Sequence, residues 1–343
     1  MLWKLIILVA LMMISGCSQA FPTPPSRFPQ LKETIVAGPG NYLLPQWSPD
    51  GRYLAFIENT TTQTQLLIYD TVSREKQVVA KDLKATYFDW DPNNRLTYLK
   101  YRPEISGSPY PSFSDLHLVD ITGNDDQILA STLSGVGNFA WFRNGEKMVI
   151  LLAPTDLRTS CQDTFLLDKR TGDYSLIVSA KDVNLDCLTR IDLSFDNEDL
   201  LIYGFRNINA LRETFFVVYN LKLQDITQEF FPNEIIPIDG TSESKPSIGD
   251  DTNSGWIGNS HWVITTVNSP EGQCYNYSIF FIDLQNLSNS FCLPTVEGIV
   301  AEPAINPDLL QIAYISHVRP GKDFLVTGEI TMEIRSQLRT NEN

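Results

Sequence analysis

The chain has 343 residues and a formal net charge of −15 at pH 7. This acidic balance argues against binding to nucleic acid or to anionic lipid headgroups, because such binding depends on Lys and Arg neutralising phosphates. A hydrophobic share of 43% and a charged share of 20% are typical of a globular protein, and the length suits one large domain or two ordinary ones.

The N-terminal segment has the pattern of an export signal. An apolar run follows Lys4 and ends at Ile14-Ser15-Gly16-Cys17. It is shorter than the roughly 20 residues of a membrane-spanning helix, and its basic start and small-residue end fit a secretory signal. Cys17 directly after Ser-Gly makes the segment resemble the lipobox of bacterial lipoproteins. An ordinary secretory signal with a chance cysteine, or a free N-terminal anchor, remains an alternative.

The lipoprotein resemblance implies a defined processing of the N-terminus. The Cys17 thiol receives a diacylglycerol, the signal peptide 1–16 is removed, and the new N-terminus is acylated, for instance with palmitate. Residues 17–30 then form a lipidated tether, since they contain four prolines and no helical or strand period. Ser18 in place of Asp implies sorting to the outer membrane in a host that has one. No second apolar stretch reaches transmembrane length, so the lipid is the expected membrane attachment.

Four further cysteines predict two disulfides, which suits an exported chain. We expect Cys274 to pair with Cys292, because both lie equally far from Asp283 near the middle of a predicted hairpin. Cys161 and Cys187 bracket a turn signal in the same way. Four buried thiols are the alternative, and the spacings do not suit a metal site.

The remaining chain is organised by a repeat of an aromatic or aliphatic anchor, a polar turn and an alternating apolar strand. The anchors are spaced roughly 43 to 63 residues apart, which suits a four-stranded propeller blade. The copies are 45–58, 88–100, 139–152, 191–204, 254–267 and 303–316, with anchors Trp47, Trp90, Trp141, Leu193, Trp256 and Ile305.

A short apolar strand ending in an acidic or amide residue follows most copies. Turn signals every 8–12 residues or so, with almost no helical period, predict an all-β chain. These later strands are predicted at 65–70, 115–120, 164–168, 215–220 and 278–283, and outer strands at 76–80, 126–130 and 174–178.

The sequence WSPDGRYLAF with the later LLIYD resembles the TolB-type β-propeller repeat. The resemblance covers residues 31–338 and implies six blades, with a polar tail at 339–343. Segment 33–37 has no blade of its own, so it is expected to close the ring as the outer strand of the last blade. The final strands are then expected at 324–330 and 331–335. TolB is a soluble periplasmic protein with an additional N-terminal domain, so the resemblance transfers the fold and not the pathway.

The motif residues have structural roles in this interpretation. Trp47, Trp90 and Trp141 are expected to fill the space between blades, with a ligand-stacking face as the alternative. Pro49, Asp50 and Gly51 suit a tight turn. Asp70, Asp120, Asp168 and Asp283 are expected to begin hairpin turns, and they lack the alternating acidic pattern of a calcium loop.

The sequence lacks the G-x-S-x-G, H-E-x-x-H and P-loop motifs, so no catalytic residue, metal or cofactor is predicted. His117, His261 and His317 fall at non-equivalent repeat positions and are expected to be structural. Paired carboxylates for glycoside chemistry stay open, because their spatial pairing is not visible in a sequence.

Two long intervals between strands are candidate binding surfaces. Segment 101–114 carries Tyr110 and Phe113 and suits docking of a protein or glycan, whereas 230–254 is acidic and suits a simple insertion. The leading hypothesis is a monomeric, lipid-anchored envelope protein that binds other envelope proteins on the outer side of the membrane. The alternatives are binding of a glycan or small solute in the propeller funnel, and a degenerate hydrolase or lyase with a carboxylate pair there.

Overall fold

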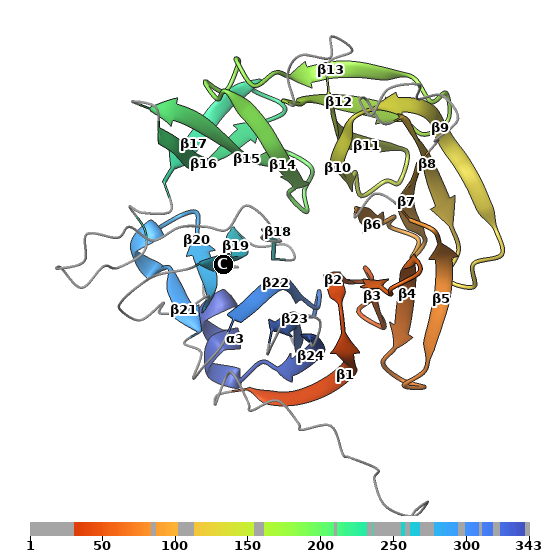
Figure 1. The fold of residues 1–343 in the computed structure, drawn as a ribbon. Coiled ribbons are helices and arrows are strands. Elements are labelled where there is room, and N and C mark those ends of the chain that lie inside the picture. Colours follow the sequence, from red (N-terminus) through yellow and green to blue (C-terminus); the bar gives the residue numbers. More distant parts are fainter. Residues whose placement is uncertain are drawn as a thin grey trace, which may run out of the picture.

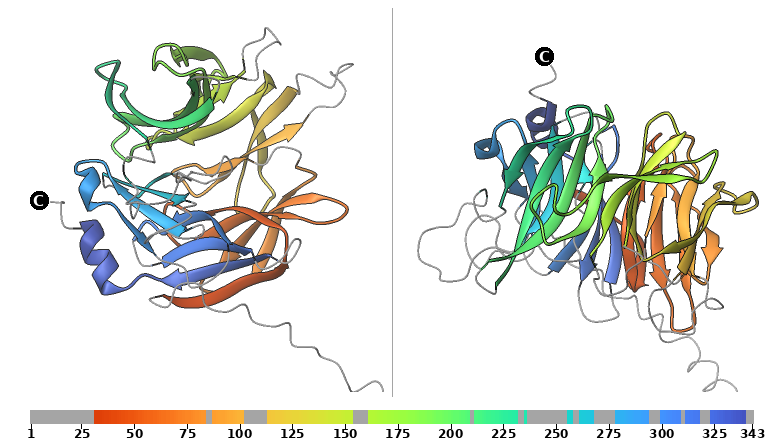
Figure 2. Two further views of the ribbon diagram at one scale, coloured as in Figure 1. Left: turned by 60° about the vertical axis from the view of Figure 1, so that its left-hand side comes forward. Right: turned by 90° about the horizontal axis from the view of Figure 1, so that it is seen from above.

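The computed structural model describes residues 31–83, 87–101, 113–153, 161–208, 211–231, 235, 255–257, 261–267, 278–293, 299–308, 311–317 and 323–339. These residues form six four-stranded antiparallel sheets arranged as a ring, which is a six-bladed β-propeller (Figure 1). The side view in Figure 2 shows the blades standing next to one another around the axis. The predicted fold class and blade number are therefore confirmed. Among the described residues, no helix is both long and apolar enough to cross a membrane.

Five blades use their strands in chain order from the axis outward, and the last blade runs β22, β23, β24 and then β1 (Figure 1). The innermost strands are β2 (Tyr42–Trp47), β6 (Phe88–Trp90), β10 (Val136–Trp141), β14 (Cys187–Leu193), β18 (Gly255–Trp256) and β22 (Ile299–Ile305). The second strands are β3 (Tyr53–Asn59), β7 (Leu96–Tyr101), β11 (Lys147–Leu152), β15 (Asp199–Ile208), β19 (Trp262–Val267) and β23 (Gln311–His317).

The outer half of each blade follows the predicted strands. The third strands are β4 (Thr64–Asp70), β8 (Phe113–Val119), β12 (Asp163–Asp168), β16 (Leu211–Asn220), β20 (Ser278–Asp283) and β24 (Asp323–Glu329). The fourth strands are β5 (Lys76–Lys81), β9 (Asp126–Ser134), β13 (Tyr174–Val178), β17 (Asp225–Phe230), β21 (Phe291–Leu293) and β1 (Lys32–Gly40). A short 3₁₀ turn, η2 (Leu287–Asn289), lies between β20 and β21.

The ring is closed by its first strand. β1 pairs antiparallel with β24, with Lys32 opposite Glu329 and Ile35 opposite Val326. The last blade therefore combines the start of the propeller with its end, as predicted for segment 33–37. This closure removes a free sheet edge, which would otherwise be open to pairing with another chain.

The expected final strand at 331–335 is wrong, because the chain there forms the helix α3 (Met332–Arg339). β1 already occupies the outer position of the last blade, so no sheet edge remains for another strand. Ile334 and Leu338, one helical turn apart, are buried in the cluster between the last two blades. The Thr331 hydroxyl accepts a hydrogen bond from Ile334 N–H at 3.4 Å, as an N-cap residue does.

The hydrophobic core is divided among the six joints between neighbouring blades. Each joint holds one apolar cluster built from the facing sides of two sheets. Trp47, Trp90 and Trp141 belong to three of these clusters and are 5–8% exposed. They therefore pack between blades, as the sequence indicated.

The anchor tryptophans are followed by a tight turn. Ser48 Oγ donates to Asp50 Oδ1 at 2.6 Å, and the same carboxylate oxygen accepts from Arg52 N–H at 3.0 Å. Gly51 has φ +70°, a conformation that glycine adopts without steric cost. The turn after Leu193 repeats this arrangement, since Ser194 Oγ donates to Asp196 Oδ1 at 2.6 Å.

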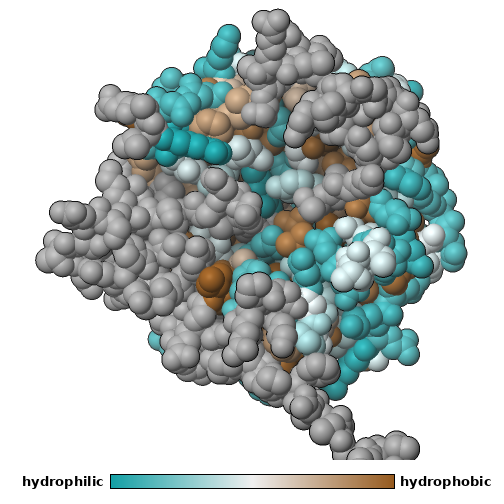
Figure 3. Space-filling view, viewed as in Figure 1, coloured by the Kyte–Doolittle hydropathy of each residue, from teal (hydrophilic) through white to brown (hydrophobic). Residues whose placement is uncertain are grey.

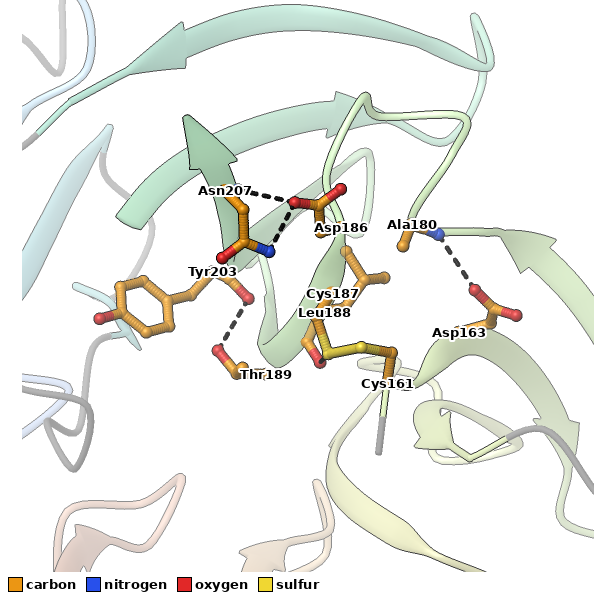
Figure 4. Close-up of a disulfide and its surroundings, with 9 residues drawn as sticks. All are labelled: Cys161, Asp163, Ala180, Asp186, Cys187, Leu188, Thr189, Tyr203 and Asn207. Atoms are coloured by element: carbon orange, nitrogen blue, oxygen red, sulfur yellow. Dashed lines mark hydrogen bonds between the residues drawn. A yellow bond between two sulfur atoms is a disulfide. The ribbon is translucent and has the colours of Figure 1, made fainter. Parts of the chain in front are cut away.

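A disulfide joins Cys161 and Cys187, whose Cα atoms are 4.8 Å apart (Figure 4). Cys161 lies two residues before the start of β12, whereas Cys187 begins β14 of the next blade. The bond therefore links two neighbouring blades. The predicted pair is correct, but the predicted reason, that the two cysteines face each other across one hairpin, is wrong. Beside it, Gln162 forms a β-bridge with Leu188 across the same joint. Cys292 is disulfide-bonded, and its expected partner Cys274 lies outside the described residues.

Candidate functional site

The residue before each anchor faces the axis of the propeller. β2, β10, β14 and β22 each carry a register shift a few residues before their anchor, and such bulges re-aim side chains. Leu44 and Glu302, at two of these shifts, have positive φ. The six residues that precede the anchors all line the axial cavities; they are Gln46, Asp89, Ala140, Asp192, Gly255 and Ala304.

Two connected cavities lie along the axis. The outer one, here called the mouth, has a volume of about 520 Å³ and is walled by four tryptophans and three prolines: Trp47, Trp90, Trp141, Trp256, Pro49, Pro92 and Pro307. The inner one, here called the channel, has a volume of about 190 Å³ and is lined by more polar side chains, including Gln46, Asn138 and Arg190. Asp89 and Asp192 line both the mouth and the channel. Figure 3 views the ring from the face opposite the mouth, where hydrophobic and hydrophilic residues meet around the central depression.

Hydrogen bonds across the blade joints hold the channel walls. Asn138 exchanges two bonds with the Ile191 backbone, at 2.6 and 2.9 Å, and Trp90 Nε1 donates to Gln46 O at 3.2 Å. The Glu302 carboxylate accepts from Leu44 N–H. Of the joints that the described residues form, five carry such a bond, so the site rests on a rigid frame.

Asp89 and Asp192 occupy equivalent positions in the second and fourth blades. Asp89 accepts from its neighbour Trp90 N–H at 2.8 Å and from the Trp141 backbone N–H of the next blade. Asp192 accepts from Leu193 N–H at 2.9 Å and from Trp256 N–H at 2.7 Å.

Glycine at residue 255 leaves room for this contact. A Cβ there would lie 2.9 Å from Asp192 Oδ2, a separation that real Cβ atoms almost never show. Gly255 thus lets the carboxylate reach the backbone of the neighbouring blade.

Both carboxyl groups are harder to ionise than usual. Burial raises the pKa of Asp89 to about 8, and the negative charge of Asp192 adds to this shift. Burial raises the pKa of Asp192 to about 6, opposed by the hydrogen bond from Trp256 N–H and by the charge of Arg190. At neutral pH the pair therefore carries about one negative charge in an enclosed space.

The indole N–H of Trp256 differs from those of the other anchors. Trp47 Nε1 donates to Ala304 O at 3.2 Å and Trp141 Nε1 to Thr97 Oγ1 at 2.8 Å, each in the preceding blade. Trp256 Nε1 and Gln46 Oε1 are buried and have no hydrogen-bond partner among the described residues. One unused donor and one unused acceptor therefore belong to residues that line the channel.

The three histidines each contact an aspartate. His117 Nδ1 lies 2.9 Å from Asp126, His261 Nε2 3.2 Å from Asp283, and His317 Nδ1 2.9 Å from Asp323. None of them lines the mouth or the channel. These contacts give each histidine a local structural partner.

The sequence-predicted binding residues are not at the axis. Tyr110 and Cys17 lie outside the described residues. Phe113 begins β8 at the end of the sheet opposite the mouth, because Ser114 pairs with Tyr101 whereas Val119 pairs with Leu96. Among the described residues, no group of three or more His, Cys, Asp or Glu could hold a metal ion.

Sequence reasoning missed Asp89 and Asp192. The one available signal was the acidic residue directly before the anchor in the second and fourth copies of the repeat. That signal does not reveal that the position faces the axis.

The chain matches no family model and no curated protein sequence. Its fold is similar to that of TolB from Acinetobacter baumannii, with a TM-score of 0.58 and 14% identity over 77% of this chain. A putative TolB from Agrobacterium tumefaciens aligns over 88% with a TM-score of 0.51 and 12% identity, covering 99% of that chain. An oligogalacturonate lyase in complex with manganese aligns over 89% of this chain and 94% of its own, with a TM-score of 0.54 and 13% identity.

These similarities concern the fold alone. The aligned region spans 57% of the Acinetobacter TolB chain. The TolB-like propeller fold agrees with the resemblance inferred from the repeat, and the activity of any of these proteins does not follow from it.

Proposed function

We propose that this protein is a lipid-anchored, protein-binding module of the cell envelope that receives a segment of a partner at the mouth. The observation that carries the proposal is the composition of the mouth. Four tryptophans, three prolines and Phe195 surround a space of about 520 Å³ on a rigid ring. Trp256 and Phe195 keep the largest exposed fractions among these aromatic side chains, whereas Trp47, Trp90 and Trp141 are 5–8% exposed and supply the edges of the wall. Tryptophan is among the residues that contribute most to binding energy at protein interfaces.

The cellular setting of the proposal rests on the N-terminus and on the disulfide. A Cys161–Cys187 disulfide is compatible with an oxidising space outside the cytoplasm. The lipobox-like sequence ending at Cys17 supplies the anchor, and the TolB-like fold is one that suits an interaction module.

Binding is preferred to catalysis at this site. A pair of carboxylates with separated pKa values is a pattern that acid–base enzymes use. Here, however, each carboxylate accepts two backbone N–H groups and so joins two blades. The activity named for the lyase neighbour is a poor fit as well, because its oligogalacturonate substrate is polyanionic and this chain has a net charge of −15.

The proposal is tested by crosslinking from the rim of the mouth in intact envelopes of the native organism. A photo-crosslinking amino acid replaces Phe195, which lines the mouth and is 37% exposed. The matched control carries it at Tyr174, which is 51% exposed on the outer strand β13. We expect one envelope protein to be captured reproducibly from position 195 and not from position 174. Equal capture from both positions would contradict a binding surface at the mouth.

A second candidate is a glycan or small solute bound at the same place. The volume of the mouth lies in the range of roughly 300–1,000 Å³ that is usual for small-molecule sites. If no protein is captured from position 195, quenching of tryptophan fluorescence by neutral oligosaccharides would favour this candidate.

A further inference from the structure

We infer that the channel binds a cationic side chain, the ammonium of a lysine or the guanidinium of an arginine, between Asp89 and Asp192. The side chain belongs to an extended segment of the partner that enters through the mouth. This inference rests on the proposed function and adds the chemistry of the bound group.

The shape and polarity of the two cavities suit such a side chain. The mouth and channel share five lining residues, so one leads into the other: Trp47, Asp89, Asp192, Trp256 and Ile305. The mouth is the more apolar of the two cavities, and the two carboxylates line both of them. A lysine or arginine side chain matches this arrangement, because its stem is apolar and its end is charged. Tryptophan faces also attract cations.

With both carboxyl groups ionised, the charged side chains of the channel lining sum to one net negative charge. Asp89 on β6 and Asp192 on β14 are acidic, and Arg190 on β14 is the basic residue of the channel lining. Arg143 lies at the mouth, where its guanidinium carbon is 3.7 Å from the centre of the Phe195 ring. β2, β10 and β18 contribute the neutral Gln46, Asn138 and Gly255 to the channel, and the Glu302 carboxylate of β22 accepts from Leu44 N–H.

Two unused polar atoms point independently to a ligand. Trp256 and Gln46 line the channel together with the two aspartates, and their Nε1 and Oε1 atoms are buried and lack partners among the described residues. Buried polar atoms without partners are costly, so a bound group that satisfies them is favoured. The carbonyl and N–H of an extended peptide would supply one acceptor and one donor.

Cation binding is expected to be coupled to a proton. A positive charge beside the pair favours the ionised carboxylates, and Asp89 is largely protonated at pH 7 because burial raises its pKa to about 8. Binding at pH 7 should therefore release a proton to the solvent. Affinity should rise as the pH increases from 6 to 8, where the unbound pair becomes ionised.

The experiment is isothermal titration calorimetry on the full-length chain in detergent micelles. The probes are a capped tri-lysine peptide, the same peptide with acetylated lysines, and spermidine. Titration at pH 7 in two buffers of different ionisation enthalpy measures the protons released. We expect the tri-lysine peptide to bind at least about tenfold more tightly than its acetylated form, with proton release. Equal affinity for both peptides, no binding of either, or binding without proton release would overturn the inference.

Variants locate the site. Asp89→Asn and Asp192→Asn should each weaken tri-lysine binding by at least about tenfold. Asp173→Asn, which removes an exposed carboxylate from a turn between outer strands, should leave binding unchanged. An equal loss in all three variants would show a general charge effect and overturn the assignment. Thermal melts confirm that each variant is folded.

Two comparisons complete the test. The first distinguishes a peptide from a free polyamine as the source of the cation, and the second distinguishes failure of this inference from failure of the proposed function. Tighter binding of tri-lysine than of spermidine would identify a peptide as the ligand. Tighter binding of spermidine would identify a free polyamine and would overturn the inference that the cation belongs to a partner segment. Failure of all cationic probes, with protein capture retained from position 195, would reject this inference and leave the proposed function standing.

Discussion

At the residue scale, Asp89 and Asp192 combine a structural role with the binding role proposed for them. Each connects its blade to the next through backbone N–H groups, and each lines the axial cavities. Their enclosure makes ionisation costly, as the raised pKa values of both groups indicate. Sites that bind charged ligands often hold such groups at the expense of stability.

Replacing Asp89 by Asn should stabilise the fold at alkaline pH. The folded-state pKa of Asp89 is about 8, above its ordinary value of 3.8, so the native state binds this proton more tightly than the unfolded chain. The cost of ionisation is therefore absent below about pH 4 and grows as the pH rises to 8. We expect Asp89→Asn to increase the free energy of unfolding by at least about 1 kcal/mol more at pH 8 than at pH 5.

Urea denaturation at the two pH values measures this difference. Asp173→Asn serves as the control, because its carboxylate is exposed and should show no such dependence. The same change in stability at both pH values for Asp89→Asn would contradict the assignment of a buried, costly charge.

At the element scale, the blade is the repeating unit and the joints between blades carry the core. The blades are held together by apolar clusters, by the closing strand β1 and by the Cys161–Cys187 disulfide. The disulfide crosses the joint between the third and fourth blades, the same joint that the paired Asn138 and Ile191 hold near the axis. The two connections fix this joint at separate points.

Removing the disulfide should destabilise the propeller. The two cysteines are 26 residues apart. Closing a loop of this length lowers the conformational entropy of the unfolded chain, which raises the free energy of unfolding by about 3 kcal/mol. We expect a variant with Cys161→Ala and Cys187→Ala to lose about 2–4 kcal/mol of unfolding free energy. Chemical denaturation measures the loss, and a native mass spectrum of the parent protein checks that the bond is formed. An unchanged denaturation midpoint would show that the bond does not restrain the unfolded chain.

At the scale of the whole molecule, the mouth and the entry of the N-terminal segment lie on the same side of the ring. Ile305 lines the mouth and pairs with Ile312, whose strand begins beside Glu329, and Glu329 pairs with Lys32. The 14 residues from Cys17 to Gln30 can span at most roughly 50 Å. With Cys17 lipidated, the mouth would open within this distance of the lipid surface, where an envelope partner can reach it.

The anchor itself is tested by Cys17→Ser. Stable attachment by acylation depends on several buried methylene chains, each CH₂ contributing about 0.8 kcal/mol. Without the thiol no diacylglycerol can be attached, so the variant should move from the membrane pellet to the soluble fraction. Ultracentrifugation after an alkaline wash measures the distribution, with Cys161→Ala/Cys187→Ala as a control that keeps the lipid site. An unchanged membrane fraction would contradict the lipoprotein interpretation.

Most of the fold was predictable because its information is local. The alternation of apolar residues and the polar turn residues between them specify most strands within a few residues. The helix at 332–339 escaped prediction because segment 331–335 also has strand-like alternation. Ile334 and Leu338 are four residues apart and so share one helix face, and this spacing favours a helix only because a core lies beneath that face.

The sequence by itself determined the six blades, their strand order and the closing role of the first strand. These features follow from a repeat whose period matches one sheet and from the need to pair every sheet edge. The tertiary structure alone decided the channel, the pairing of Asp89 with Asp192 and the inter-blade position of the disulfide. Asp89 and Asp192 lie two blades apart in the chain. They face the same axis only because the ring closes, and the depth of that enclosure sets how costly their charges are.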